Sequence, residues 1–289
     1  MSSTTPVPPP PPPAPTYGAA PVTLDLSKSG PIPFGRLVAV EWRKMIDTRS
    51  GIWLLAITGG LLALVMALIV LVVGLNGYQV DAEGLSQGLS FPVSLLLPVF
   101  GILTVTSEWS QRTALTSFTL EPRRIRVIGA KLAAVSTLAV ATIVLAVVLG
   151  VVTNLLCAAV TGNPLQWNLD AGQFFWTIIS QLAFFAMGFA LACLLLNTPG
   201  AISLFYVVAL LLPLMLWGTL FALFDWARDI LPWIDINTAL SPLMMGTDIN
   251  GNLATVEPIN YVQGIWTVIL WVGVPVSLGI WRILRSEVK

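Results

Sequence analysis

The sequence predicts an all-α, polytopic membrane protein with six transmembrane helices. Of its 289 residues, 56% are hydrophobic and 10% are charged, whereas an ordinary soluble domain is about 25% charged. Six apolar stretches contain no Asp, Glu, Lys or Arg: residues 52–75, 88–106, 132–160, 173–197, 201–224 and 261–281. Each is long enough to cross a hydrocarbon core, which takes about 20 helical residues. A soluble single domain is therefore excluded.

The basic residues are distributed unevenly between the two sides of these stretches. If both termini are cytoplasmic, thirteen of the 14 Lys and Arg residues fall on the inner side, and Arg228 alone falls outside. The positive-inside rule then predicts that orientation. We expect the chain to lie in the inner membrane of a bacterial cell, with membrane lipid as a partner. No basic domain is present to neutralise phosphates, so nucleic acid is not expected as a partner.

The segment before the first span divides into two parts. Residues 1–33 carry eleven prolines and predict a disordered cytoplasmic tail. Residues 34–50 have helical periodicity, with Phe34, Val38 and Trp42 on one face, and predict an amphipathic helix on the inner membrane surface. Glu41 interrupts the apolar face, which a simple surface anchor would avoid. At the other end, residues 284–289 form a short cytoplasmic tail after the transmembrane domain of residues 51–283.

Two connections are long enough to do more than join helices: residues 107–131 inside and 225–260 outside. The outer loop has Trp226, Ile230, Trp233 and Ile234 at helical spacing, which predicts a short helix, either capping a pathway or anchoring the loop at the interface. In the same loop, the segment from Asp248 to Asn252 is typical of a polar turn rather than of a calcium site.

Several chemistries are excluded by residue type. The chain has no histidine, and its two cysteines, Cys157 and Cys193, belong to opposite ends of their spans, so a serine-histidine hydrolase, a structural zinc site and a disulfide are excluded. No P-loop sequence occurs, and no ionisable residue falls inside the six stretches, although ion-coupled carriers usually need one. We expect no cofactor, and if the protein transports, another subunit supplies the energy.

The inner segment 107–131 and the helix before the first span carry a distinctive pattern. A glutamate is followed by Arg-Thr, by Pro-x-Arg with further arginines, and by a final lysine, at Glu108, Arg112, Thr113, Pro122, Arg123, Arg124, Arg126 and Lys131. Upstream stand Glu41, Arg43 and Lys44. With six spans, this pattern resembles the membrane subunit of a type-two ATP-binding cassette (ABC) transporter, over most of the chain from Phe34 onward.

The resemblance implies roles for these residues. The eight residues of the inner segment would belong to a cytoplasmic coupling helix and its surroundings, resting on a separately encoded ABC ATPase. Glu41, Arg43 and Lys44 would belong to an entry helix beside it. The chain would be a permease without its own ATPase site, not an enzyme. It would form a dimer with a second copy or a related permease, and it would export an apolar or amphipathic compound.

Three other interpretations stay open. The inner arginines could act only as anchors, each contributing about 1 kcal/mol against anionic lipid. The protein could be a secondary carrier, or a membrane-embedded transferase that uses Asp225, Asp229 or Asp235. Within the spans, Asn154 and Gln181 are the strongest hydrogen-bonding side chains, and we predict that they pair across two helices, with about 1 kcal/mol of stabilisation, rather than contact substrate.

Overall fold

The computed structural model describes residues 32–110, 123–167 and 170–285. Within these ranges, six helices are long and apolar enough to cross a membrane: Arg49–Asn76, Ala82–Ser110, Arg124–Thr161, Ala171–Leu195, Thr198–Leu223 and Pro258–Arg285. They contain the six predicted stretches almost entirely, and the only β-structure in this part of the chain is two isolated bridges. The prediction of an all-α protein with six candidate spans is confirmed.

Helix α1, Phe34–Asp47, precedes the first candidate span, α2, Arg49–Asn76. The predicted helix of residues 34–50 is three residues too long, because Thr48 leaves the helical conformation and its Oγ1 accepts a hydrogen bond from the Gly51 amide at 3.2 Å. A threonine at this position caps the next helix and so separates the two. Three predicted segments lie outside the described residues: 1–31 of the proline-rich tail, 111–122 of the predicted coupling helix, and 286–289 of the C-terminal tail.

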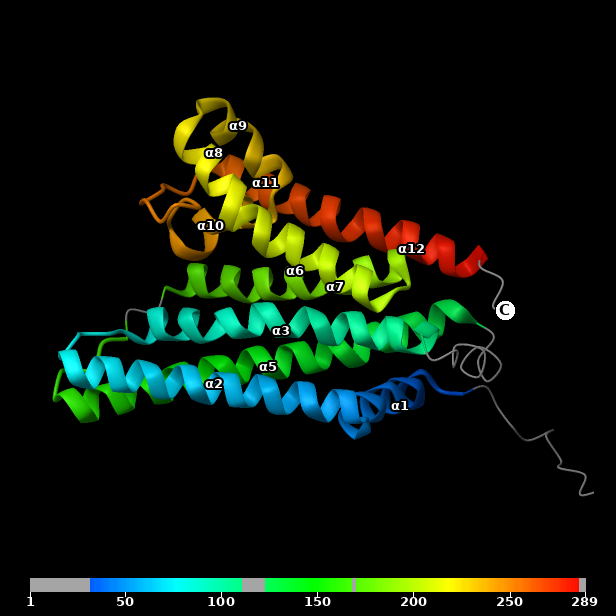
Figure 1. Cartoon of the computed structure of the whole chain (residues 1–289), viewed down its shortest axis with the longest axis horizontal. Helices are drawn as coiled ribbons and strands as arrows, with labels where there is room; N and C mark the ends of the chain where they lie inside the picture. Colours follow the sequence, from blue (N-terminus) through cyan, green and yellow to red (C-terminus); the bar gives the residue numbers. More distant parts are fainter. Residues whose placement is uncertain (1–31, 111–122, 168–169, 286–289) are drawn as a thin grey trace, which may run out of the picture. The chain divides into compact units, whose positions relative to one another are not determined.

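Helix α3, Ala82–Ser110, is central: it packs against α5, Arg124–Thr161, and α6, Ala171–Leu195 (Figure 1). The most apolar segments of α3 and α6 are 61% and 67% buried, against 17% for α2. Close packing requires small residues, and a Cβ added to Gly188 of α6 would lie 2.8 Å from the Cβ of Pro98 on α3. Helices α3 and α6 are therefore the most buried part of the core, α5 contributes one face to it, and α2 lies at its edge.

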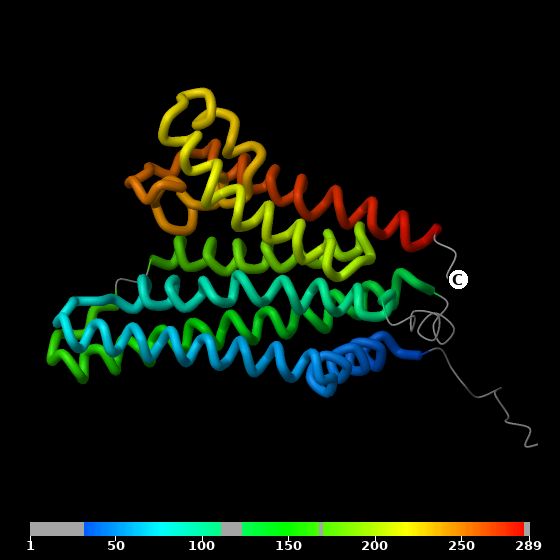
Figure 2. The backbone as a smooth tube through the Cα atoms, in the orientation of Figure 1, coloured from blue at the N-terminus to red at the C-terminus, as the bar shows by residue number. Residues whose placement is uncertain are grey.

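The fifth and sixth spans contain π-helical segments. The fifth consists of α7 (Thr198–Tyr206), η2 (Val207–Leu211), η3 (Pro213–Trp217) and α8 (Gly218–Leu223). These four segments form one continuous helical span (Figure 2). The sixth consists of α11 (Pro258–Val268), η4 (Ile269–Gly273) and α12 (Val274–Arg285). Such wide turns often occur at functional sites.

Two short helices connect these spans, α9 (Asp225–Ile234) and α10 (Ile236–Met245). The helical spacing predicted for Trp226 and its neighbours is confirmed, and the side chains of Trp226 and Ile230 are about half exposed. Helix α10 packs on α6, α9 and α11. After α10, the Asp248 carboxylate accepts hydrogen bonds from the backbone amides of Asn250 and Asn252, which is the predicted polar turn.

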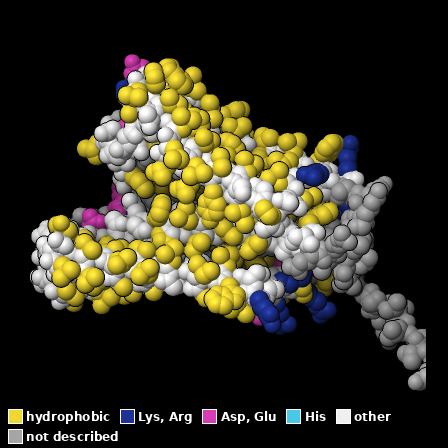
Figure 3. Space-filling model, viewed as in Figure 1, with side chains coloured by type: hydrophobic (Ala, Val, Ile, Leu, Met, Phe, Trp, Pro, Cys, Tyr) yellow, Lys and Arg dark blue, Asp and Glu magenta, His cyan; other side chains and the backbone are white. Residues whose placement is uncertain are grey.

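Charge is segregated between the two ends of the helices. On the face seen in Figure 3, Lys and Arg gather where α1 and the last turns of α12 lie, whereas most of the visible Asp and Glu lie towards the opposite end of the helices, with hydrophobic side chains between. We call these the α1 end and the α10 end. The apolar band between them fits a multi-pass membrane protein.

Candidate functional site

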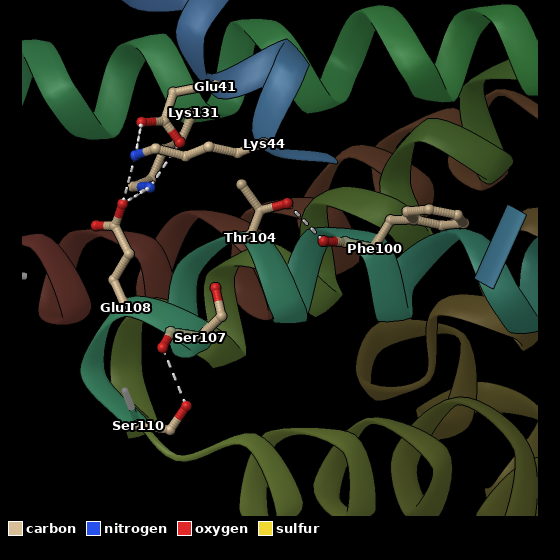
Figure 4. A network of polar contacts seen from close by, with 8 residues as sticks. All are labelled: Glu41, Lys44, Phe100, Thr104, Ser107, Glu108, Ser110 and Lys131. Atoms are coloured by element: carbon tan, nitrogen blue, oxygen red, sulfur yellow. Dashed lines mark hydrogen bonds and ion pairs between the residues drawn. The ribbon is translucent and has the colours of Figure 1, made fainter. Parts of the chain in front are cut away.

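Four charged side chains from three helices form a closed ring at the α1 end. Lys44 Nζ lies 2.7 Å from Glu41 Oε1 and 2.8 Å from Glu108 Oε1. Lys131 Nζ lies 2.7 Å from Glu41 Oε2 and 2.8 Å from Glu108 Oε1. Each ammonium group therefore bridges both carboxylates (Figure 4). We call Glu41, Lys44, Glu108 and Lys131 the ion-pair ring.

The ring follows from where each helix begins or ends. Glu41 and Lys44 are three residues apart on α1, so they share one face. Glu108 lies in the last turn of α3, and Lys131 lies two turns into α5, beyond the apolar stretches that the sequence predicts. Because α1 packs against α5, and α5 against α3, the four side chains converge where the charge-free parts of the helices end.

Burial makes the ring different from a surface ion pair. Glu41, Glu108 and Lys131 are 5%, 8% and 5% exposed, whereas 43% of the Lys44 side chain is exposed. Two positive charges balance two negative charges, so no member is left uncompensated. Removing one partner from a buried pair typically costs about 3–5 kcal/mol, because the other charge stays buried without compensation. The ring thus resists separation of α1, α3 and α5.

The exposed member of the ring keeps its charge. Burial by itself would lower the pKa of the Lys44 amine, but its hydrogen bonds to Glu108 and Glu41 outweigh burial and raise that pKa above 10.5. A lysine whose folded pKa is raised contributes stability below its unfolded pKa, and that stability is lost only as pH rises through the folded value. Lys44 is therefore protonated and paired across the physiological pH range.

Other basic residues at the α1 end bind helix termini. Arg124 Nη1 donates to the Ile283 carbonyl at 2.7 Å, and Arg282 donates to the Leu194 carbonyl. Both carbonyls belong to the last turn of a helix, where the backbone has no helical donor, and a cation there also complements the helix dipole. The Arg285 guanidinium lies 4.4 Å from the Trp281 ring centre. Arg124 and Arg282 thus tie α12 to α5 and α6, a role beyond lipid anchoring.

The predicted coupling residues thus divide into three groups. The structure brings Glu41, Lys44, Glu108 and Lys131 together. It places Arg43 and Arg123 at exposed positions, and Arg124 and Arg126 at half-exposed positions at the start of α5, outside the ring. Arg112, Thr113 and Pro122 lie outside the described residues. Glu108 is buried, and its ion pairs with Lys44 and Lys131 join α3 to α1 and α5.

The predicted hydrogen bond between Asn154 and Gln181 is wrong, although both side chains are buried. Asn154 Nδ2 donates to the Gln166 carbonyl at 3.0 Å, and Gln181 Nε2 donates to the Ser90 carbonyl at 2.8 Å. The Gln166 carbonyl also accepts from the Ala82 amide. Each side-chain amide therefore donates to a backbone carbonyl, and the two side chains do not bond each other.

The acidic residues weighed for a transferase are not gathered into one site. Asp225 is exposed and pairs with Arg228 at 3.2 Å, and Asp229 is exposed. Asp235 is buried, and its Oδ2 accepts hydrogen bonds from the amide and hydroxyl of Thr238, as an N-cap of α10. None of the three lines the main cavity of the described chain. The geometry gives the transferase interpretation no support.

Sequence reasoning named every member of the ring but not the ring itself. The available signal was Glu41, a carboxylate on an otherwise apolar helical face, which implies a buried cationic partner. A second missed contact is the hydrogen bond from Thr198 Oγ1 to Thr106 Oγ1, at 2.7 Å, which joins α7 to α3. Nothing in the sequence singles out this pair.

Comparison with known proteins adds no assignment: no family model matches this sequence, and neither a curated protein nor a solved structure matches it.

Proposed function

We propose that the chain is the membrane-spanning subunit of a type-two ABC exporter. The observation that carries the proposal is the ion-pair ring, because two of its members lie on α3 and α5, the helices that segment 111–122 connects. The motif resemblance of residues 107–131 and the lack of a P-loop in a six-span chain add support. ATP hydrolysis then belongs to a separate cytoplasmic ATPase.

The ring suggests how force from an ATPase would spread. A push on the segment between α3 and α5 would move the ends of both helices, and α1 would follow, because separating it would leave Glu41 buried without a cation. The three helices would then move as one body. In this proposal α1 lies along the inner leaflet, beside the ATPase, with exposed Arg43 near the lipid headgroups.

The remaining features of the proposal concern orientation and assembly. The α1 end carries most of the basic residues, which supports a cytoplasmic position for it and for both termini in a bacterial inner membrane. A second permease copy would pack on spans whose apolar side chains are exposed, such as α2 and the fifth span. Export of an apolar or amphipathic compound would occur between the two helix bundles as they rock.

The direct test is ATP-driven transport by this chain together with any P-loop ATPase that copurifies with it. We expect Glu108→Gln to reduce transport and ATPase stimulation while the protein still reaches the membrane, because the variant weakens the link between α3 and the other two helices. The control is Asp225→Asn, which breaks an exposed ion pair at the α10 end. Membrane abundance is measured for each variant.

A full charge reversal separates the ring's role from folding. Changing all four residues restores an opposite charge at every contact of the ring, so it should recover transport lost in Glu41→Lys or Lys131→Glu alone; the changes are Glu41→Lys, Lys44→Glu, Glu108→Lys and Lys131→Glu. Wild-type transport by Glu108→Gln at normal abundance would contradict a coupling role for the ring. Failure of any P-loop ATPase to copurify with the wild-type chain would contradict the proposed family.

Orientation has its own test, on a background without Cys157 and Cys193. Single cysteines at Ser110 and Asn250, both exposed at opposite ends of the helices, should react with an impermeant reagent from opposite sides of intact cells. Labelling of both from outside would contradict the proposed topology.

A further inference from the structure

A cavity of about 540 Å³ lies at the α10 end, between α3, α6, the fifth span and α10 of a single copy. Its wall is mixed: Phe91 and Phe184 provide aromatic surface, and Ser94, Gln181 and Asn237 provide polar atoms. Sites for small ligands typically enclose about 300–1,000 Å³ and combine an apolar wall with a few polar groups. The cavity has the size and composition of such a site.

Three side-chain donors around the cavity form contacts between helices. Tyr206 Oη on the fifth span, Asn237 Nδ2 on α10 and Gln181 Nε2 on α6 each donate to a backbone carbonyl of a neighbouring helix, at 2.8, 3.1 and 2.8 Å. Each of these three groups therefore has one N–H or O–H committed to a contact between helices.

One of these contacts shows why the wall is fixed. Asn237 donates to the carbonyl of Ala209, four residues before Pro213. Proline has no N–H, so it cannot donate the helical hydrogen bond to that carbonyl. Asn237 occupies the vacant position and joins α10 to the π-helical part of the fifth span. This hydrogen bond directly links two elements that line the cavity, α10 and the fifth span.

One side-chain acceptor beside the cavity, in contrast, has no hydrogen-bond partner in the described part of the chain. Gln181 is 4% exposed and lines the cavity, yet its Oε1 has no hydrogen-bond partner among the described residues. The Ser90 carbonyl can only accept, so it fixes the amide with Nε2 towards itself and leaves Oε1 as the free atom. The Ser94 carbonyl loses its helical donor to Pro98 in the same way.

The charge around the cavity also limits its ligand. Its described lining contains no Lys or Arg, and it contains one carboxylate, Asp248. Arg228 and Asp248 line a neighbouring hollow together, so the local charges are close to balanced and no positive charge on the ligand is required. A negatively charged headgroup would meet the unpartnered acceptors and the Asp248 carboxylate, and no Lys or Arg in the described lining.

We propose that this cavity binds an amphiphile whose headgroup donates hydrogen bonds and carries no negative charge, such as an alkyl amine, amide or alcohol. The headgroup hydrogen-bonds the acceptors beside Gln181, and the alkyl chain lies against Phe91 and Phe184. The exposed side chains of Phe91 and Leu214, 59% and 74%, give the rim an apolar side for the chain. Binding needs neither the ATPase nor a second copy, so it goes beyond the proposed function and can fail independently of it.

The experiment uses the purified full-length chain in phosphatidylcholine nanodiscs, without an ATPase. A dodecylamine with a photoreactive diazirine on its chain is crosslinked, and labelled peptides are identified by mass spectrometry. We expect saturable labelling of α3 and the fifth span. Unlabelled dodecylamine and dodecanamide should compete, and dodecanoate should compete at least about tenfold less well, because its headgroup lacks a donor and is charged.

Two matched variants locate the site. Ser94→Phe fills the cavity without breaking a contact between helices, since Ser94 Oγ donates only to the Phe91 carbonyl in its own helix, and it should abolish saturable labelling. Ser277→Phe is the control, because Ser277 also bonds within its own helix and lies outside the cavity. Gln181→Leu should weaken competition by dodecanamide about tenfold by removing the acceptor.

Unchanged labelling in Ser94→Phe, or equal competition by dodecanoate, would overturn the proposal. The source of the ligand is distinguished by native mass spectrometry of the chain purified from membranes. A lipid that copurifies with the wild type but not with Ser94→Phe supports a membrane lipid as the occupant. Saturable dodecylamine labelling without a copurified lipid supports a free solute. Absence of both contradicts binding altogether.

Discussion

The two ends of the helices handle buried polar groups in opposite ways. At the α1 end, the ring pairs four charges with one another, and both carboxylates accept from both lysines. At the α10 end, the polar groups around the cavity are mostly neutral, and Gln181 Oε1 and Asp235 Oδ1 are buried without partners among the described residues. Fully paired groups hold helices together, whereas unpaired acceptors beside a cavity leave capacity for a ligand.

The largest difference should appear when one buried cation of the ring is removed. We expect Lys131→Met to cost about 3–5 kcal/mol of unfolding free energy, because Glu41 and Glu108 then share the single, partly exposed Lys44. Denaturant unfolding in micelles measures the loss. Lys44→Met should cost clearly less, since 43% of the Lys44 side chain is exposed. Equal losses in the two variants would contradict the importance of burial in the ring.

The contact between α6 and α12 at the same end gives a smaller effect. A Cβ on Gly279 of α12 would lie 2.6 Å from the backbone carbon of Cys193 on α6, so Gly279→Ala should cost about 1–3 kcal/mol by forcing the helices apart. Gly273→Ala is the control, since its Cβ would meet only the Ile269 side chain at 3.7 Å. Thermal unfolding should show no loss for this second variant.

At the α10 end, the Asp235 carboxylate has hydrogen bonds to only one of its two oxygens among the described residues. Asp235→Ala removes the cap that bonds the Thr238 amide, so it should cost about 1 kcal/mol. Asp235→Asn keeps an acceptor for that amide and should cost less. The comparison of both variants by thermal unfolding at neutral pH measures the value of the cap, and an equal loss would show that the negative charge matters.

The pH dependence of stability should also reveal Asp235. Burial raises the pKa of this carboxyl above its usual 3.8, and the hydrogen bonds from Thr238 offset burial only in part. The folded state therefore holds the proton to a higher pH than the unfolded state, so stability falls as pH rises from 3.8 through the folded pKa. Asp235→Asn should remove that fall; an unchanged profile would contradict the raised pKa.

The smallest effect is expected for the exposed pair of Asp225 and Arg228, in which 98% of the Asp225 side chain is exposed. Exposed ion pairs contribute little because water and salt screen them. Asp225→Asn should leave the unfolding temperature unchanged within error, at low and high salt. A clear loss would mean that the α10 end depends on charge in the same way as the α1 end.

Most of the fold could be predicted from the sequence, whereas the site could be predicted only in part. Charge-free stretches identify the six long helices because length and hydropathy alone decide whether a helix can span. The cap at Thr48 was not predicted, so the predicted helix of residues 34–50 extended three residues too far. The rotation of each helix about its axis was not readable, because most of the spans are apolar on every side.

The sequence by itself determined the class of protein, the positions of its spans and the segregation of its charges, since each depends on composition along the chain. Only the tertiary structure decided which polar groups meet. Glu41 pairs with Lys131, 90 positions away, and Gln181 bonds the Ser90 carbonyl instead of Asn154. The physical reason is that a buried polar side chain must find some partner, and helix packing, not residue type, determines which partner lies within reach.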